Sequence, residues 1–210
     1  MPLELQGIER TALLVIDMQN GFCASGGSFA ALGLDVSMCT AAIPGCVTLV
    51  EAARAAGVSV VYTRYVYRAD YQDGGVLVQE ILPAMQEAKS LAAGTWDAEL
   101  VEELVPSAAE FVVDKNRYSA FYATGLQPIL TSLGVRDLIL CGVTTNMCVE
   151  TTARDASQRD YRVFVVSDAT GELDRARHEL ALGTIGFGFG AVVTSEQVVA
   201  AWGAEPSPDT

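Results

Sequence analysis

Short runs of apolar residues alternate with longer segments of mixed polarity along the chain. Six runs have the length and β-branched composition of buried strands: residues 11–17, 58–63, 111–114, 137–141, 162–167 and 191–194. Their hydrophobicity is nearly continuous, which is typical of strands covered on both faces in a parallel sheet. The pattern therefore predicts a core of parallel strands.

The segments between these runs carry helical start and stop signals. Pro44 opens a helical segment that stops at Gly57, and Gly134 follows another segment over residues 126–133. Further helices are expected from near Thr145 past Arg154, over residues 179–185, and after Thr194–Ser195. This alternation of strands and helices predicts a three-layer α/β/α sandwich with right-handed crossovers.

The chain shows no internal repeat and no low-complexity linker, so we expect one domain over residues 1–202. The stretch from Arg64 to Glu110 is the least regular, and we expect it to form loops over the active face. The last residues, 203–210, read GAEPSPDT and are expected to be a disordered tail.

Composition narrows the function classes. Half of the residues are hydrophobic and only 19% are charged, a balance that argues against disorder. The formal net charge of −13, from 26 acidic and 13 basic residues, disfavours binding to nucleic acids or to anionic membranes. No apolar run approaches the roughly 20 residues of a membrane span, and the N-terminal sequence MPLELQGIER lacks a signal-peptide pattern.

Cysteine and histidine usage adds two expectations. The five cysteines are odd in number and form no CxxC motif, which favours a reducing compartment and a cytoplasmic protein. His178, the single histidine, is expected on a helix surface. One histidine excludes a multi-histidine metal site and nearly excludes a Ser-His-Asp triad. We therefore expect a carboxylate base, with no metal and no cofactor.

Three reactive side chains follow predicted strands. Asp17 ends the first run, Lys115 follows the third, and Cys148 lies in the first turn of the helix after the fourth. In an open parallel sheet, ligands bind at this carboxyl edge. A helix start and a nearby cation lower the pKa of a thiol, a carboxylate can carry its proton to a leaving amine, and backbone N–H groups can hold an oxyanion. The set predicts acyl transfer through a thioester, with water as the final acceptor.

Each of these residue types also has an ordinary structural role. An aspartate at a strand end commonly caps a turn, a lone lysine is commonly solvated, and a buried cysteine commonly acts as a small hydrophobic residue. We expect that last role for Cys23, Cys39, Cys46 and Cys141. The joint placement at one edge favours catalysis over the alternative of a non-catalytic α/β module that binds small molecules.

Three motifs resemble those of the isochorismatase-like cysteine hydrolases. They are DMQNGF after the first run, DKNRYSAF after the third and GVTTNMCVE after the fourth, and the resemblance covers about residues 10–202. It implies a six-stranded parallel sheet in the order 3-2-1-4-5-6 and a catalytic triad of Asp17, Lys115 and Cys148. It also implies a cis peptide between Val143 and Thr144, with the backbone N–H groups of Thr144 and Cys148 as the oxyanion hole.

Differences among family members narrow the activity. Nicotinamidases of this fold carry an Asp-x-His…His metal cluster after the second strand, and residues 63–68 contain no histidine. The patterns KxRYSAF and TNxCVExTxRD are most similar to those of hydrolases acting on ureido and carbamoyl compounds such as ureidoacrylate, biuret and N-carbamoylsarcosine. The resemblance thus implies a small linear amide as substrate and a homo-oligomer, dimer or tetramer. Nicotinamidase-like and maleamate-like amidases remain alternatives.

Residues next to these motifs are candidates for substrate contact. We expect the following side chains to line the pocket: Asn20, Phe22, Arg64, Trp96, Arg117, Tyr118 and Phe121. Among the arginines, Arg64, Arg68 or Arg117 is expected to hold a substrate carboxylate through a bidentate pair.

Overall fold

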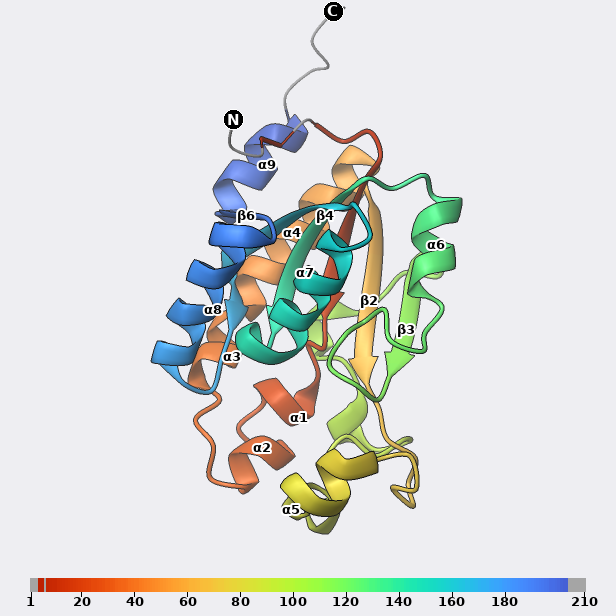
Figure 1. Cartoon of the computed structure of the whole chain (residues 1–210), viewed down its shortest axis with the longest axis vertical. Helices are drawn as coiled ribbons and strands as arrows, with labels where there is room; N and C mark the ends of the chain where they lie inside the picture. Colours follow the sequence, from red (N-terminus) through yellow and green to blue (C-terminus); the bar gives the residue numbers. More distant parts are fainter. Residues whose placement is uncertain (1–3, 6, 204–210) are drawn as a thin grey trace, which may run out of the picture.

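The structure, a computed structural model, describes residues 4–5 and 7–203 and contains one sheet of six parallel strands (Figure 1). The strand order, β3-β2-β1-β4-β5-β6, confirms the order that the resemblance implied. The strands are β1 (Thr11–Ile16), β2 (Ser59–Tyr65), β3 (Phe111–Lys115), β4 (Asp137–Val143), β5 (Arg162–Gly171) and β6 (Ala191–Val193). Of the expected tail, Gly203 closes the last helix, and residues 204–210 lie outside the described residues.

Helices cover both faces of the sheet, as the alternation predicted. On one face, α4 (Ile43–Ala56) packs against α9 (Ser195–Gly203). The opposite face carries α6 (Leu126–Ser132), α7 (Glu150–Ser157) and α8 (Arg175–Gly188), with α7 in the middle (Figure 1). The short segments are α1 (Asn20–Cys23), α2 (Ser28–Ala31), α3 (Ser37–Ala41), η1 (Leu77–Ile81), α5 (Ala84–Glu87), η2 (Trp96–Ala98), η3 (Glu102–Leu104) and η4 (Thr145–Val149).

The central strands form the hydrophobic core. Every residue of β1 and β4 is buried, which explains why their sequences are almost continuously apolar. At the sheet edge, β3 leaves Phe111 and Val112 exposed. No helix among the described residues is long and apolar enough to cross a membrane.

The carboxyl ends of the strands point to one end of the molecule, where α1, α2 and α5 lie (Figure 1). The irregular stretch from Arg64 to Glu110 supplies η1, α5, η2 and η3, so it contains short helices as well as the predicted loops. This end of the sheet also carries the side chains of the candidate site.

Gly142, near the end of β4, allows the two central strands to approach closely. Its φ of +111° lies in a region that residues with a side chain rarely adopt, and a Cβ added there would lie 2.0 Å from the carbonyl oxygen of Ile16. The glycine therefore sets the spacing between β1 and β4 immediately beside Asp17.

Replacing Gly142 with alanine is expected to lower the free energy of unfolding by at least about 2 kcal/mol, because overpacking and a disfavoured φ act together. Gly183 provides the matched control, since it lies inside α8 and a Cβ there meets nothing within 4 Å. Gly183→Ala should stabilise the fold by about 0.5–1 kcal/mol. Urea unfolding followed by circular dichroism measures both changes. Equal stability of the two variants would contradict this account of Gly142.

Candidate active site

Asp17 directly follows β1 and is fully buried. Its backbone has a left-handed φ of +51°, a conformation that disfavours most residues other than glycine. Its N–H donates to the carbonyl oxygen of Thr63 at 3.1 Å, and the Thr63 hydroxyl donates to Asp17 Oδ1 at 2.6 Å. These bonds hold one carboxylate oxygen and leave Oδ2 directed at the other members of the site.

Lys115 is the last residue of β3, and β2 lies between it and β1. Its Nζ reaches across β2, passing 4.3 Å from the centre of the Tyr65 ring. It ends 2.6 Å from Asp17 Oδ2, and both side chains are fully buried. Nζ also donates to the carbonyl oxygen of Arg117 at 3.1 Å, so the ammonium is surrounded by acceptors.

Cys148 lies on η4, the π-helical turn that follows β4. The turn is closed by a bond from the Val149 N–H to the Thr144 carbonyl oxygen at 3.1 Å. Lys115 Nζ donates to Cys148 Sγ at 3.3 Å. The ammonium thus contacts both the carboxylate and the sulfur, so the structure brings together the three residues expected from the strand ends.

The electrostatics of the thiol differ from the simple expectation of a cation-activated cysteine. Burial raises the pKa of Cys148 well above its ordinary value; Lys115 lowers it, and the charge and hydrogen bonding of Asp17 raise it again. For Lys115, burial opposes the charged form, but the charges of Asp17 and Cys148 outweigh this effect and raise its pKa. Burial and Asp17 thus favour the protonated thiol, and Lys115 opposes them.

Gln19 fixes the backbone around this ion pair. Its side chain accepts from the Tyr65 N–H at 2.6 Å and donates to the carbonyl oxygens of Tyr65 at 3.0 Å and Ala98 at 2.8 Å. The fully buried amide joins the start of α1 to the end of β2. It positions the Tyr65 ring that faces Lys115.

The turn before Cys148 contains the cis peptide between Val143 and Thr144 that the resemblance implied. Within the described part of the chain, the Thr144 N–H donates to no acceptor, and Thr144 lines the same cavity as Cys148. This leaves a backbone donor beside the sulfur, as an oxyanion hole requires.

The same turn is attached to the β5–α8 segment by polar contacts. The Thr145 hydroxyl donates to the Gly171 carbonyl oxygen and lies 2.9 Å from His178 Nδ1, while the Asn146 N–H donates to Glu172 Oε2 at 2.9 Å. The expectation of a surface His178 is wrong: the residue is buried, because its ring meets Thr145, and burial lowers its pKa.

A cavity of about 190 Å³ opens above Cys148 and Thr144. Phe22 and Tyr118, both expected to contact substrate, line it. The remaining lining residues are Phe29, Leu34, Tyr65, Leu77, Leu82, Met85, Leu91, Met147, Glu172, Leu173 and Arg177. The walls are therefore mostly apolar, and among the described residues the charged lining side chains, Glu172 and Arg177, both come from the segment after β5.

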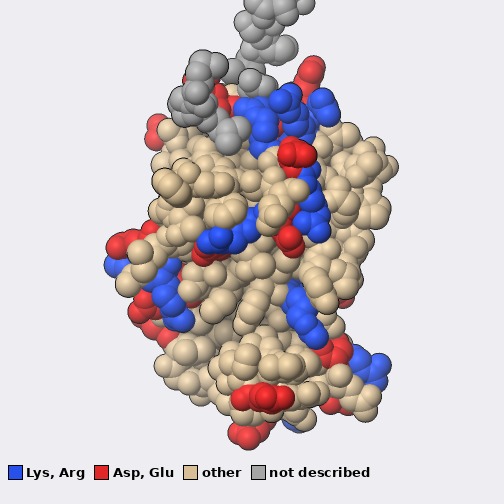
Figure 2. Space-filling model, in the orientation of Figure 1, with Lys and Arg blue, Asp and Glu red and all other residues tan. Residues whose placement is uncertain are grey.

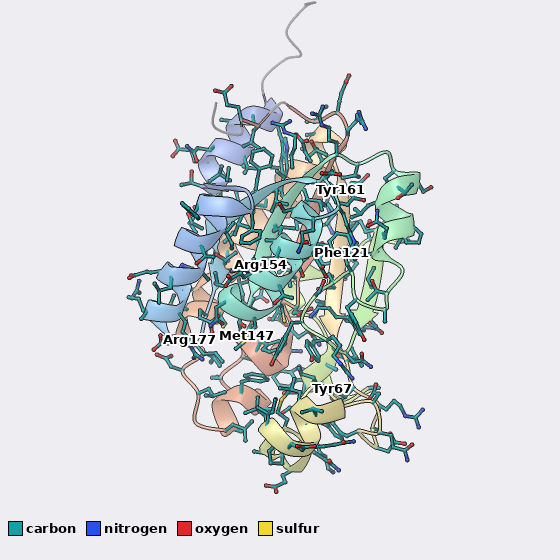
Figure 3. All side chains as sticks on the ribbon, in the orientation of Figure 1. Tyr67, Phe121, Met147, Arg154, Tyr161 and Arg177 are labelled. Carbon is teal, nitrogen blue, oxygen red and sulfur yellow. The ribbon has the colours of Figure 1, made fainter. Side chains whose placement is uncertain are left out.

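Two of the expected contacts lie around a different hollow. Asn20 donates its side-chain N–H to the Trp96 carbonyl oxygen at 2.9 Å, and both residues line this second hollow instead of the one above Cys148. Phe121 packs against Tyr161, with ring centres 5.9 Å apart, and both are distant from Met147 in Figure 3.

The expected arginines are also directed elsewhere. Arg64 makes a two-bond pair with Asp114, at 2.8 and 2.9 Å, outside the cavity. Arg68 pairs with Asp70 at 2.7 Å. Arg117 donates to the carbonyl oxygens of Asp73 and Asn116. None of these three arginines is among the described residues that line the cavity above Cys148.

Arg177 is the arginine that lines the cavity, and the sequence analysis missed it. It lies on α8 near Met147 (Figure 3). Glu172, also missed, directly follows β5 and is almost completely buried, with its carboxylate accepting from Asn146 and Leu173. Glu172 directly follows a strand, as Asp17 does. This signal was hidden because the predicted strand ended at Ser167, whereas β5 extends to Gly171.

No group of three or more His, Cys, Asp or Glu side chains in residues 4–5 and 7–203 is arranged to hold a metal ion. The reactive groups described are thus the thiol of Cys148, the ammonium of Lys115, the carboxylate of Asp17 and the backbone N–H of Thr144. They can form a sulfur nucleophile, move one proton and stabilise an oxyanion.

Comparisons with known proteins identify the family of this chain. The model of the isochorismatase domain matches residues 11–197, so the chain belongs to the isochorismatase family and is a hydrolase of that family. A ureidoacrylate amidohydrolase, RutB, from Azorhizobium caulinodans is 38% identical over 175 residues, covering 78% of this chain and 77% of the relative. The family resemblance inferred from the three motifs is confirmed.

Two solved structures are similar over nearly the whole chain. A cysteine hydrolase from Pseudomonas syringae pv. phaseolicola 1448A has a TM-score of 0.84 at 34% identity, covering 96% of this chain and 94% of that one. An N-carbamoylsarcosine amidase from Thermoplasma acidophilum has a TM-score of 0.71 at 27% identity, covering 89% and 96%.

The opposing effects of Lys115 and Asp17 on the thiol predict opposite shifts in alkylation. Asp17→Asn removes a charge that raises the pKa of Cys148, so iodoacetamide should react faster at a given pH and the profile should move to lower pH. Lys115→Met removes a charge that lowers this pKa, so the profile should move to higher pH. Both pH profiles are measured by quenching the alkylation at set times and quantifying the alkylated Cys148 peptide by mass spectrometry.

Circular dichroism of each variant controls for loss of the fold, since breaking a buried ion pair is destabilising. Shifts in the same direction for the two folded variants would contradict the assigned roles.

Proposed function

We propose that this protein is a cysteine amidohydrolase that cleaves the C–N bond of small ureido or carbamoyl compounds through a thioester intermediate. The observation that carries the proposal is the contact of Lys115 Nζ with both Asp17 Oδ2 and Cys148 Sγ, at 2.6 and 3.3 Å, beneath a cavity. The amide class is supported by the similarity to the ureidoacrylate amidohydrolase and the N-carbamoylsarcosine amidase.

In the first half of the reaction, Asp17 accepts the thiol proton as Cys148 Sγ attacks the substrate carbonyl carbon. The negative charge that develops on the carbonyl oxygen is held by backbone N–H groups, of which Thr144 provides one. The C–N bond then breaks, and Asp17 passes the proton to the departing nitrogen, which leaves as ammonia or an amine. Lys115 stays protonated throughout and stabilises the thiolate that exists during the transfer.

In the second half, water attacks the carbonyl carbon of the thioester. Asp17 accepts a proton from the water, the C–S bond breaks, and the proton returns to the sulfur. The products are the carboxylic or carbamic acid and the free thiol. Each step uses this chain's own residues and water, so the proposed cycle requires no cofactor.

A non-catalytic binding module is less consistent with this arrangement. Burying a lysine and an aspartate costs several kcal/mol per ion, and the pair is often replaceable by apolar residues at no loss of stability. Binding a neutral ligand would gain nothing from such a pair beside a thiol. Nicotinamidase-like and maleamate-like amidases share the triad. Assays with a panel of amides distinguish these activities from hydrolysis of ureido and carbamoyl compounds.

Replacing Cys148 with alanine is expected to abolish ammonia release from a panel of ureido, carbamoyl and simple amides, with the fold intact. Cys141 serves as the control, because it is a buried thiol within β4 whose Sγ faces the Leu14 carbonyl oxygen at 3.9 Å. Cys141→Ala should affect stability and leave kcat within a few-fold. Retention of more than a few per cent of activity by Cys148→Ala would overturn the mechanism.

Arg177, in place of the three arginines expected from sequence, is proposed to bind a substrate carboxylate at the cavity. Arg177→Gln should lower kcat/KM for a linear ureido acid by about 10- to 150-fold, as expected for a charged hydrogen bond of about 1.5–3 kcal/mol, with little change for the neutral amide analogue. Arg64→Gln is the control and should change neither. A loss confined to Arg64→Gln, or an equal loss for acid and amide, would discard this role.

A further inference from the structure

Six apolar residues of the cavity lining come from the segments before β2 and after β2, and we call them the apolar wall: Phe22, Phe29, Leu34, Leu77, Leu82 and Met85. The first three come from α1, α2 and the segment after α2, and the last three from η1, the two-residue link after it and α5. These elements lie together at the carboxyl end of the sheet in Figure 1. The wall therefore converges on Cys148 from two separate parts of the chain.

Part of this lining is open to water. Leu34 is 39% exposed, Leu82 is 46% exposed, and Met147, on the turn that carries Cys148, is 37% exposed. Single exposed apolar residues are common on protein surfaces. Here, however, three of them border one cavity above a nucleophile, and exposed apolar surface of this kind marks a ligand site.

The size of the cavity limits what can fill it. An apolar cavity of about 150 Å³ is large enough to hold benzene, and the volume here is about 190 Å³. A carbamoyl group alone would leave most of the apolar wall uncovered. A branched aliphatic chain or a single ring, attached next to the carbamoyl group, would cover it.

The charged residues of the cavity lining come from a different part of the chain than the apolar wall. Glu172 and Arg177 line the cavity from the β5–α8 segment, whereas the apolar wall comes from α1, α2, η1 and α5. A ligand with its carbonyl at Cys148 can therefore present an anionic group toward Arg177 and an apolar group toward the wall. A ureido acid without an apolar substituent offers nothing to the wall.

We propose that the preferred substrates are carbamoyl compounds whose nitrogen carries an apolar substituent of the size of a branched chain or one ring. This inference rests on the proposed function, because it assumes that Cys148 attacks the carbamoyl carbon. The apolar group displaces water from Leu34, Leu82 and Met147 and holds the carbonyl in line with the sulfur. Selectivity then comes mainly from the wall, which acts on a part of the substrate that does not react.

Paired substrates test this directly. N-carbamoylleucine and N-carbamoylglycine share the carbamoyl group and the carboxylate and differ only in the apolar side chain. We expect kcat/KM to be at least about tenfold higher for N-carbamoylleucine, because one or a few methylene groups in an apolar pocket are worth about 10- to 200-fold. An equal or lower value for N-carbamoylleucine, with clear turnover of N-carbamoylglycine, would overturn the inference and leave the proposed function standing.

Neighbouring residues provide matched variants. Leu82→Ser should reduce the ratio of kcat/KM for N-carbamoylleucine to kcat/KM for N-carbamoylglycine by about tenfold. Ile81 is 64% exposed and does not line the cavity, so Ile81→Ser should leave the preference intact. Both positions are partly exposed, so neither substitution removes core packing. An equal effect of the two substitutions would overturn the role of the wall.

Binding to Cys148→Ala separates the two levels of the proposal. A larger thermal stabilisation by N-carbamoylleucine than by N-carbamoylglycine, in the absence of any turnover by the unmodified protein, would support the apolar wall and overturn the proposed function. The absence of any difference in thermal stabilisation would overturn the inference.

Discussion

The buried ion pair between Lys115 and Asp17 is the interaction on which the site depends. Taking two charges out of water costs several kcal/mol per ion, and a contact at 2.6 Å offsets this only if the remaining polar atoms are also satisfied. Thr63 supplies a hydroxyl to the carboxylate, the Arg117 carbonyl accepts from the ammonium, and the Tyr65 ring covers it. Three strands thus contribute to one pair of charges, and the Cys148 sulfur is a further group that this pair contacts.

Much of the fold, and the clustering of Asp17, Lys115 and Cys148, could be predicted from sequence, because the central strands are buried on both faces and therefore leave clear apolar runs. The end of β5 was missed for a physical reason. Ser167 and Asp168 interrupt the apolar run, yet they lie inside the strand, where Ser167 donates to the Val193 carbonyl and Asp168 caps α9 through Ser195. Because the predicted strand ended at Ser167, nothing in the sequence indicated that Glu172 lies at the carboxyl edge of the sheet.

The arginines show a different limit of sequence reasoning. Arg64 is one residue before Tyr65, but successive side chains of a strand point to opposite faces, so Tyr65 meets Lys115 while Arg64 meets Asp114 on the neighbouring strand. Proximity in sequence to a residue of the site therefore says little about the direction in which a side chain points. The apolar wall could not be predicted from sequence for a related reason. Its two halves are some 45 residues apart and line one cavity only in the folded chain.

Lys115 lies on β3, which is an edge strand of the sheet. An edge strand pairs on one side only, and β3 has two solvent-exposed apolar residues where the central strands have none. Local opening of such a strand requires less free energy than global unfolding. Separation of β3 from β2 would withdraw the ammonium while β1 and β4 kept Asp17 and Cys148 in place. The contact among Lys115, Asp17 and Cys148 consequently lasts only as long as this edge strand stays paired, whatever the stability of the core.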